Sequence, residues 1–478
     1  MRYVGLVLLA LVALVVVLLL IALVRTLLTK GKTAAYRVAA DDGRAGSYAE
    51  KLSAMVRCNT VASRENRRLE AFDAFHRVLA ELFPLVHEKV EKTVIDGNLL
   101  YCWKGVSDEK PIVLMSHQDV VPAEGRWQHE PFSGDIADGF VWGRGSADTK
   151  CSLMAIFQAV EELLAAGVTP PQDVYIASSC TEEFGGDGAP QLVEELRRRG
   201  VKPYAVFDEG GAIIDEPVGG IKGLYAMVGT FEKGQGNVRI TARSRGGHSS
   251  APPRKTPLTT LAAFVREVDK KDIFRRRISP EVAGMFSRLA PFAPFAYRLL
   301  FGNLWLFGPV LKAVMPMVSP QAAAMLRTSI SFTMAHGSEA CNVIPQEAAV
   351  VANLRFIPHQ GMEESLGLLR DTAEKYGLET EVLDAHDASP CLDIRGDVWA
   401  LTEKVVAETF PGLPVIPYVV VGGTDCRFFN AICDNCVRFS PVVYGKEQLS
   451  GMHGLNETMS VDCLAGAVDF YKTLIRSV

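Results

Sequence analysis

The chain lacks a surplus of positive charge. Its 50 Lys and Arg residues face 55 Asp and Glu residues, which gives a net charge of −5 and a pI near 6.1. It contains no basic stripe and no RNA-binding motif, which argues against a nucleic-acid partner. The ten cysteines include one CxxC pair, Cys433 and Cys436, with no second pair after it. This pattern favours packing roles over a structural zinc or redox site. Internal repeats and long low-complexity segments are also absent.

Charge is missing altogether from residues 4–24. An apolar run of about 20 residues spans a bilayer as a helix, whereas the apolar part of a cleaved signal peptide has about 7–15 residues. We therefore predict a single-pass membrane anchor over residues 4–24 and a polar linker over 30–46. A removed signal sequence is the alternative.

Short apolar runs that end in polar residues organise the stretch from 111 to 208. The runs occupy residues 112–115, 174–177 and 204–207. Their β-branched and aromatic residues predict buried strands. Helical segments at about 150–166 and 191–199 alternate with them, and this βαβ order predicts a mainly parallel sheet.

Potential metal ligands follow these predicted strands, and ligand sites collect at the carboxyl ends of parallel strands. A Gly-rich loop over 143–150 adds a further carboxylate. The residues expected at one edge are His117, Asp148, Glu182, Glu183 and Asp208. One histidine with several carboxylates suits zinc and exceeds the needs of one tetrahedral ion. Two metals that share a bridging carboxylate would use this surplus.

Four motifs in this region resemble those of the di-zinc aminoacylase/carboxypeptidase family and occur in its order. They are SHQDVVP (116–122), GRGSADTK (143–150), TEEFGG (181–186) and FDEGG (207–211). That family includes acetylornithine deacetylase, succinyl-diaminopimelate desuccinylase, carboxypeptidase G and carboxypeptidase S. The resemblance extends from about residue 47 to the C-terminus. It is greatest to the carboxypeptidase S and N-fatty-acyl-amino-acid synthase/hydrolase branch.

The resemblance implies a role for each motif residue. The implied metal ligands are His117, Asp148 as the bridge, Glu183, Asp208 and His453. Glu182 would be the general base, and Asp119 would orient the imidazole of His117. The pair Asp208 and Glu209 leaves a choice of ligand, and motif alignment favours Asp208. Two Zn²⁺ ions are expected, with cobalt or manganese as alternatives.

The resemblance also implies an inserted α+β lid that forms a homodimer. In it, His248 (in GGHSS) would stabilise an oxyanion in the partner subunit's site. Asn342 and Arg355 match substrate-binding positions, and an Arg fork suits a carboxylate. Gly423 and Thr424 lie in a loop that would meet the substrate through its backbone.

The expected fold is therefore α/β, with a mainly parallel catalytic sheet, an inserted α+β lid and an N-terminal transmembrane helix. The expected domain ranges are 47–221 and 389–478 for the catalytic domain and 222–388 for the lid, with an apolar insert at 274–318. Lid core is the first interpretation of the insert. The alternatives are that the insert lines an acyl pocket or that it rests on the membrane. The second follows from the apolar run that comes after three arginines.

These features predict a hydrolase that cleaves an amide or peptide bond beside a free carboxylate, acting on a small peptide or an N-acyl amino acid. A membrane-tethered binding protein with a vestigial site is the alternative hypothesis, disfavoured because the whole ligand set is present. The side of the membrane stays open. Basic residues after the apolar run favour the cytoplasm, whereas carboxypeptidase S-like relatives hold the enzyme outside it.

Overall fold

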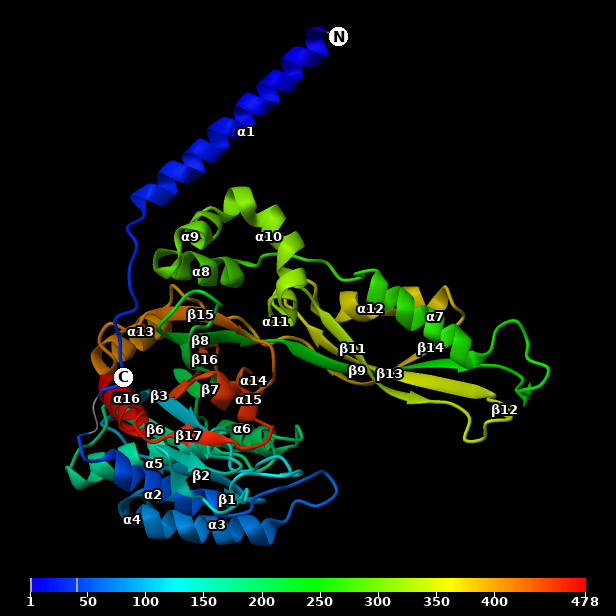
Figure 1. The fold of residues 1–478 in the computed structure, drawn as a ribbon. Helices are drawn as coiled ribbons and strands as arrows, with labels where there is room; N and C mark the ends of the chain where they lie inside the picture. Colours follow the sequence, from blue (N-terminus) through cyan, green and yellow to red (C-terminus); the bar gives the residue numbers. More distant parts are fainter. Residues whose placement is uncertain (1, 40–41) are drawn as a thin grey trace.

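The computed structural model describes residues 2–39 and 42–478. Its largest element is an eight-stranded sheet in the order β1-β2-β6-β3-β7-β16-β8-β15 (Figure 1). Its strands are β1 (Glu91–Ile95), β2 (Asn98–Trp103), β3 (Ser107–Met115), β6 (Gln172–Ser178), β7 (Ala205–Asp215), β8 (Leu224–Glu232), β15 (Val415–Val420) and β16 (Cys436–Tyr444). The central strands β6, β3, β7 and β16 pair in parallel, as do β8 and β15. The predicted mainly parallel sheet is confirmed.

Both faces of this sheet are buried under helices. In β3, Ile112 and Leu114 pack in one hydrophobic core, and Val113 and Met115 pack in another. Alternate residues of a strand point to opposite faces, so a strand covered on both sides has a continuous apolar run. The first core includes α2 (Ala45–Val56), α4 (Pro84–Lys89), α5 (Lys150–Ala165), α13 (Asp397–Thr409) and α16 (Leu464–Ser477), with α3 (Leu69–Leu82) beside them; the second includes α6 (Gly188–Arg198) and α14 (Cys426–Phe429).

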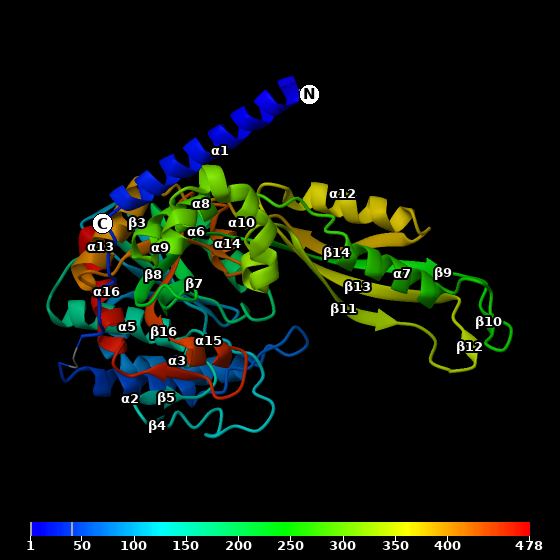
Figure 2. The same ribbon diagram turned by 45° about the horizontal axis from the view of Figure 1, so that its top comes forward.

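A separate four-stranded sheet in the order β11-β13-β9-β14 extends away from the large one (Figure 2). Its strands are β9 (Gly234–Arg243), β11 (Ser329–His336), β13 (Glu347–Phe356) and β14 (Glu379–His386). Helices α7 (Pro257–Lys270) and α12 (Gly361–Glu374) cover one face. Residues in β13 alternate in burial, as expected for a sheet with one covered face.

The expected boundary of this smaller unit at residue 222 is corrected. Strand β8 lies inside the range 222–388, but it pairs with β7 and β15 of the large sheet. The chain enters the smaller sheet only at β9.

The apolar insert is also placed differently from the first expectation. It forms α8 (Pro280–Leu289), the 3-10 helix η1 (Ala290–Phe292), α9 (Phe295–Phe301), α10 (Leu304–Val318) and α11 (Pro320–Ala324). Val282 and Met285 pack with Tyr225 of β8 and Ile416 of β15. The insert therefore covers an edge of the large sheet, and only Phe274 at its start packs in the core of the smaller one.

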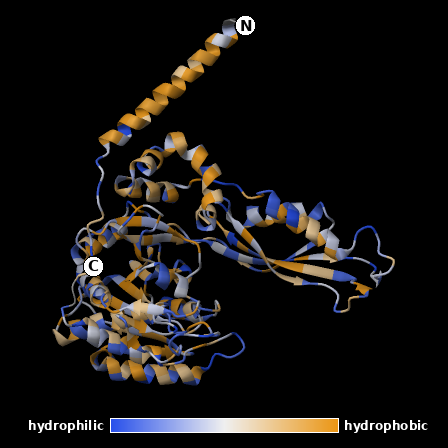
Figure 3. Ribbon diagram, in the orientation of Figure 1, coloured by the Kyte–Doolittle hydropathy of each residue, from blue (hydrophilic) through white to orange (hydrophobic). Residues whose placement is uncertain are grey.

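The remaining elements are short, apart from the N-terminal helix α1 (Arg2–Leu28). Figure 3 shows α1 as hydrophobic along nearly its whole length and standing clear of the sheets. Residues Tyr3–Leu28 are long and apolar enough to cross a membrane, and a signal sequence would have the same properties. The short elements are β4 (Ile136–Ala137), β5 (Phe140–Trp142), β10 (Gly247–His248), β12 (Val343–Ile344), α15 (Lys446–Gly451) and β17 (Thr458–Ser460).

Candidate metal centre

The candidate ligands come from loops and strands at one edge of the large sheet. Strand β3 ends at Met115, two residues before His117, and β6 ends at Ser178, shortly before Glu182 and Glu183. These two strands and β7 are parallel neighbours, so their carboxyl ends lie side by side.

His117, Asp148 and Glu209 form the first group of potential ligands, with their ligand atoms within 4.8 Å of one another. Nε2 of His117 lies 3.1 Å from Oδ1 of Asp148 and 3.2 Å from Oε1 of Glu209. On the other side of the ring, Nδ1 lies 2.9 Å from the backbone oxygen of Asp119. A proton on Nδ1 would satisfy that contact and leave Nε2 free to bind a metal.

Asp119 has a carboxylate that lies near His117 and also bonds to the loop after β6. Its carboxylate lies 3.5 Å from Nδ1 of His117, farther than its backbone oxygen. The same carboxylate accepts hydrogen bonds from the backbone N–H groups of Glu182, at 3.2 Å, and Glu183, at 3.0 Å. Asp119 therefore ties the loop after β6 to the loop after β3.

Asp148, Glu183 and His453 form the second group. Nε2 of His453 lies 3.0 Å from Oδ2 of Asp148 and 3.1 Å from Oε2 of Glu183. The two oxygens of Asp148 thus face two different histidines, with one group on each side. This is the arrangement expected of a carboxylate shared between two ions.

Glu457 supports Asp148 and was not foreseen from the sequence. Its Oε1 accepts hydrogen bonds from the backbone N–H groups of Ala147, at 2.8 Å, and Asp148, at 3.0 Å. Arg144 donates to its Oε2 at 2.7 Å. The side chains of Arg144 and Glu457 are both buried. A single Glu in a C-terminal loop carries no pattern that would have revealed this role.

Glu209, and not the predicted Asp208, lies with His117 and Asp148 in the structure. Oδ2 of Asp208 accepts a hydrogen bond from the backbone N–H of Cys426 at 2.8 Å, so this carboxylate is turned toward α14. Adjacent residues of strand β7 point to opposite faces, and Glu209 is the one that faces His117 and Asp148.

The charges of these groups fit divalent cations. Burial raises the pKa of Glu183 and of Glu209, and the neighbouring charge of Asp148 raises both further. Burial disfavours protonation of His117, but the surrounding carboxylates Glu209, Asp119 and Asp148 raise its pKa well above the ordinary value. The cluster thus has more negative charge than the protein itself balances. Two histidines and three carboxylates are ligands that suit zinc.

Glu182 lies beside the two groups without joining either. Its side chain is partly buried. Burial raises its pKa well above the usual range; His117 opposes this shift, and Glu209 and Asp425 add to it. The basicity of a carboxylate rises with its pKa, and a general base needs a pKa well above that of an ordinary exposed carboxyl group.

A polar cavity of about 760 Å³ opens onto the second group, and Glu182, Glu183 and His453 line it. Predicted substrate residues Arg355 and Gly423 also line it. Thr424 is buried beside it, and its backbone N–H donates to Glu232. Two arginines that the sequence argument missed, Arg64 and Arg427, complete its basic wall.

His248 and Asn342 lie elsewhere in the chain. His248 is in β10, which pairs with β12 at the far end of the smaller unit (Figure 2). The backbone oxygen of Asn342 accepts from the N–H of Ser249 at 3.0 Å, so these two loops meet each other and not the metal groups. Their roles at a partner subunit's site stay predictions.

Comparison with known proteins identifies relatives of this chain. The profile of the Peptidase family M20/M25/M40 matches residues 113–477. The chain is 34% identical over 437 residues to the N-fatty-acyl-amino acid synthase/hydrolase PM20D1 of Xenopus tropicalis, covering 90% of this chain and 85% of that one. It is 27% identical to carboxypeptidase S of Saccharomyces cerevisiae over 494 aligned positions, covering 90% and 84%.

Among solved structures, the chain is similar to an M20 family metallo-carboxypeptidase from Sulfolobus solfataricus. The TM-score is 0.68 at 17% identity, over 92% of this chain and 99% of the other. At this level of identity the likeness concerns the fold, which the two proteins share along nearly their whole length.

Proposed function

Because this chain belongs to the peptidase family M20/M25/M40, we propose that it is a di-zinc hydrolase that cleaves an amide bond next to a free carboxylate. The observation that carries the proposal is Asp148, whose two oxygens face the His117 group and the His453 group. The binding-protein alternative is not favoured, because the ligands and an adjacent candidate base are all present.

The proposed division of labour follows from the site. His117, Asp148 and Glu209 would hold one ion, and Asp148, Glu183 and His453 the other. Bound zinc would lower the pKa of a water molecule to about 7 and polarise the substrate carbonyl. Glu182 takes the proton from the attacking water and returns it to the leaving nitrogen. Asp119 holds the backbone of Glu182 in place for both transfers.

Arg355 is the proposed partner of the substrate carboxylate. It lines the polar cavity with Glu182 and His453. Burial lowers its pKa, and the nearby charge of Arg427 lowers it further. Arg64 and Arg427 both donate to backbone oxygens, whereas the Arg355 guanidinium has no hydrogen-bond partner within residues 2–39 and 42–478. A carboxylate would therefore supply what the Arg355 guanidinium lacks.

We expect Arg355→Met to raise KM for substrates with a free carboxylate by about 10–100-fold, because a hydrogen bond between charged groups is lost. Substrates with that carboxylate amidated should be affected much less. The measurement is kcat and KM for each substrate pair on zinc-loaded protein. Arg239→Met is the matched control, since Arg239 lies on the same small sheet but pairs with Glu381 on its surface. Equal KM changes for both substrates would contradict the assignment.

We also propose that α1 stays attached as a membrane anchor and that α9 and α10 rest on the same bilayer. Asn303, between α9 and α10, donates from Nδ2 to Oγ1 of Thr26 at 3.0 Å, which joins the insert to α1. Large apolar side chains on these two helices are exposed, among them Phe295, Trp305 and Val318. Exposed apolar area beside a hydrophobic helix suits a lipid surface.

The anchor predicts that the full-length chain stays in the membrane pellet after an alkaline carbonate wash and keeps its N-terminal mass. A soluble product that lacks the N-terminal segment would identify a cleaved signal instead.

The contact of the insert with the bilayer is tested by Trp305→Glu with Val318→Glu. This double variant should weaken binding of residues 29–478 to phospholipid vesicles by about tenfold or more, because each glutamate places a charge against the lipid at a cost of well over 1 kcal/mol. Leu258→Glu, an exposed leucine on the smaller unit, should not.

A further inference from the structure

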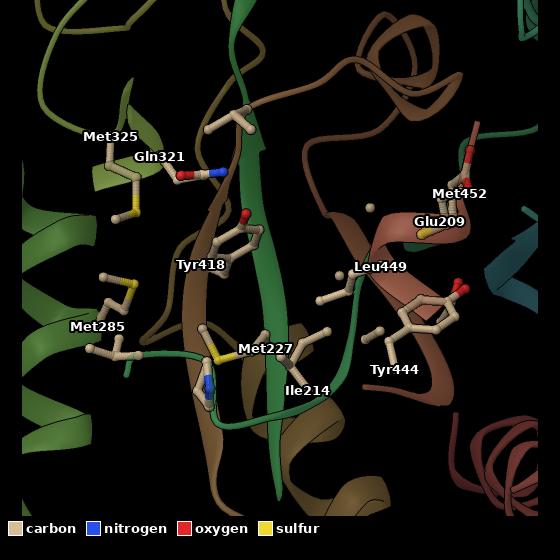
Figure 4. Close-up of a pocket in the computed structure, with 17 residues that line it drawn as sticks. Glu209, Ile214, Met227, Met285, Gln321, Met325, Tyr418, Tyr444, Leu449 and Met452 are labelled. Atoms are coloured by element: carbon tan, nitrogen blue, oxygen red, sulfur yellow. The ribbon is translucent and has the colours of Figure 1, made fainter. Parts of the chain in front are cut away.

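A second cavity, of about 360 Å³, meets the metal groups from another side. It lies over β7, β8 and β15 and is closed by α8, α11 and α15. Figure 4 shows Glu209 and Met452 at one end and Met285 and Met325 at the other. Glu209 of the first ligand group lines this cavity, whereas Glu183 and His453 of the second group line the polar cavity.

The lining of this second cavity is mainly apolar away from Glu209, with Gln321 as a further polar side chain near Met325. The side chains between its two ends are Ile214, Met227, Tyr418 and Leu449. Several polar lining groups are already engaged: the Tyr444 hydroxyl donates to the backbone oxygen of Ala147 at 2.8 Å, Ser440 accepts from Ser152 at 3.1 Å, and the Gln321 oxygen accepts from Ser319 at 2.8 Å. A peptide segment placed here would leave its amide groups without partners, which is costly. The lining favours a ligand that is mainly hydrocarbon.

Methionine dominates the ends and floor of the cavity. Met227, Met285, Met325 and Met452 all line it. Methionine side chains are unbranched and flexible, so they adapt to a chain of variable conformation better than to one fixed ring. This composition suits a linear aliphatic group of more than one length.

The two cavities have opposite chemistry, and each reaches one of the two ligand groups that share Asp148. Arginines of the polar cavity would hold the carboxylate of the amino acid. The group on the carbonyl side of the amide bond then points away from them, along the wall formed by Glu209. This inference rests on the proposed function, because the proposed reaction determines which group of the substrate lies beside Glu209.

We propose that the apolar cavity is the acyl subsite, that it takes an unbranched aliphatic acyl chain, and that Met285 and Met325 set the longest chain accepted. The enzyme is then selective for N-acyl amino acids with long chains over peptides. Met285 is buried among the helices of the insert, so the insert contributes directly to substrate choice.

The test uses the zinc-loaded full chain and N-acyl phenylalanines that carry acetyl, octanoyl, dodecanoyl and hexadecanoyl groups. We expect kcat/KM to rise by roughly threefold to fourfold for each added methylene until the cavity is full. Met285→Trp, which fills the helical end, should lower the ratio of hexadecanoyl to acetyl kcat/KM at least tenfold. Met317→Trp is the control, because Met317 is exposed on α10 and does not line the cavity; it should leave the ratio unchanged.

Two results would overturn the subsite. One is hydrolysis of acetyl substrates and dipeptides with no gain from longer chains, and the other is an unchanged ratio in Met285→Trp. If Met285→Trp does not fold, Met325→Trp blocks the same end and gives the same readout. Failure to hydrolyse any of the amides with zinc bound would instead contradict the proposed function.

Discussion

Glu182→Gln is expected to lower kcat by about 10²–10⁴-fold, the usual contribution of a positioned general base. The amide has nearly the shape of the carboxylate but cannot accept a proton. Glu182 belongs to neither ligand group, so the variant should keep both metals. The measurement is kcat on a dipeptide and an N-acyl amino acid, together with metal content per chain by mass spectrometry.

The control for this variant is Asp187→Asn. Asp187 lies five residues away, with its carboxylate exposed at the surface and paired with Arg67, so its loss should leave kcat within about twofold. Turnover retained in Glu182→Gln would show that another group accepts the proton. Loss of metal together with turnover would instead move Glu182 into the ligand set.

Glu209→Ala should lose one of the two metals and at least a hundredfold in kcat/KM, whereas Asp208→Asn should keep both metals. Removing a residue that merely orients a ligand typically costs 10–100-fold in affinity or activity, and removing a ligand should cost more. Asp208 instead accepts a backbone hydrogen bond from Cys426, which an amide oxygen can also accept.

The comparison is made by metal titration of the two metal-free variants, followed by assay at saturating zinc. The opposite pattern, with Asp208→Asn poor in metal and Glu209→Ala fully loaded, would restore Asp208 as the ligand. A fall in both variants would point to general damage within β7, which thermal unfolding of the metal-free proteins would show.

The fold of the catalytic part was predictable because its central strands are covered on both faces. Such strands have continuous apolar runs, and these runs located β3, β6 and β7. Parallel order then placed His117 and Glu183 at one edge. The choice between Asp208 and Glu209 was not predictable in this way, because adjacent strand residues differ only in the face to which they point. Sequence does not say which face carries the site.

The place of the insert was unpredictable for a different reason. Helices such as α8 and α10 would be apolar whichever of the two sheets they covered. Their composition therefore does not indicate which sheet they pack against. Strand β8 had the same ambiguity, since it comes after the catalytic motifs and directly before the smaller unit. Only the pairing of β8 with β15 and the packing of Met285 near both strands resolve it.

The loop after α15 places adjacent residues in two different cavities. Met452 lines the apolar cavity, and His453, held at a φ of 56°, belongs to the second ligand group and lines the polar cavity. A mutation that moves Met452 in this short turn therefore also changes the orientation of His453. Directed evolution toward a new hydrocarbon length should therefore tolerate few mutations here and should accumulate them on the insert, where adaptation leaves the reacting centre undisturbed.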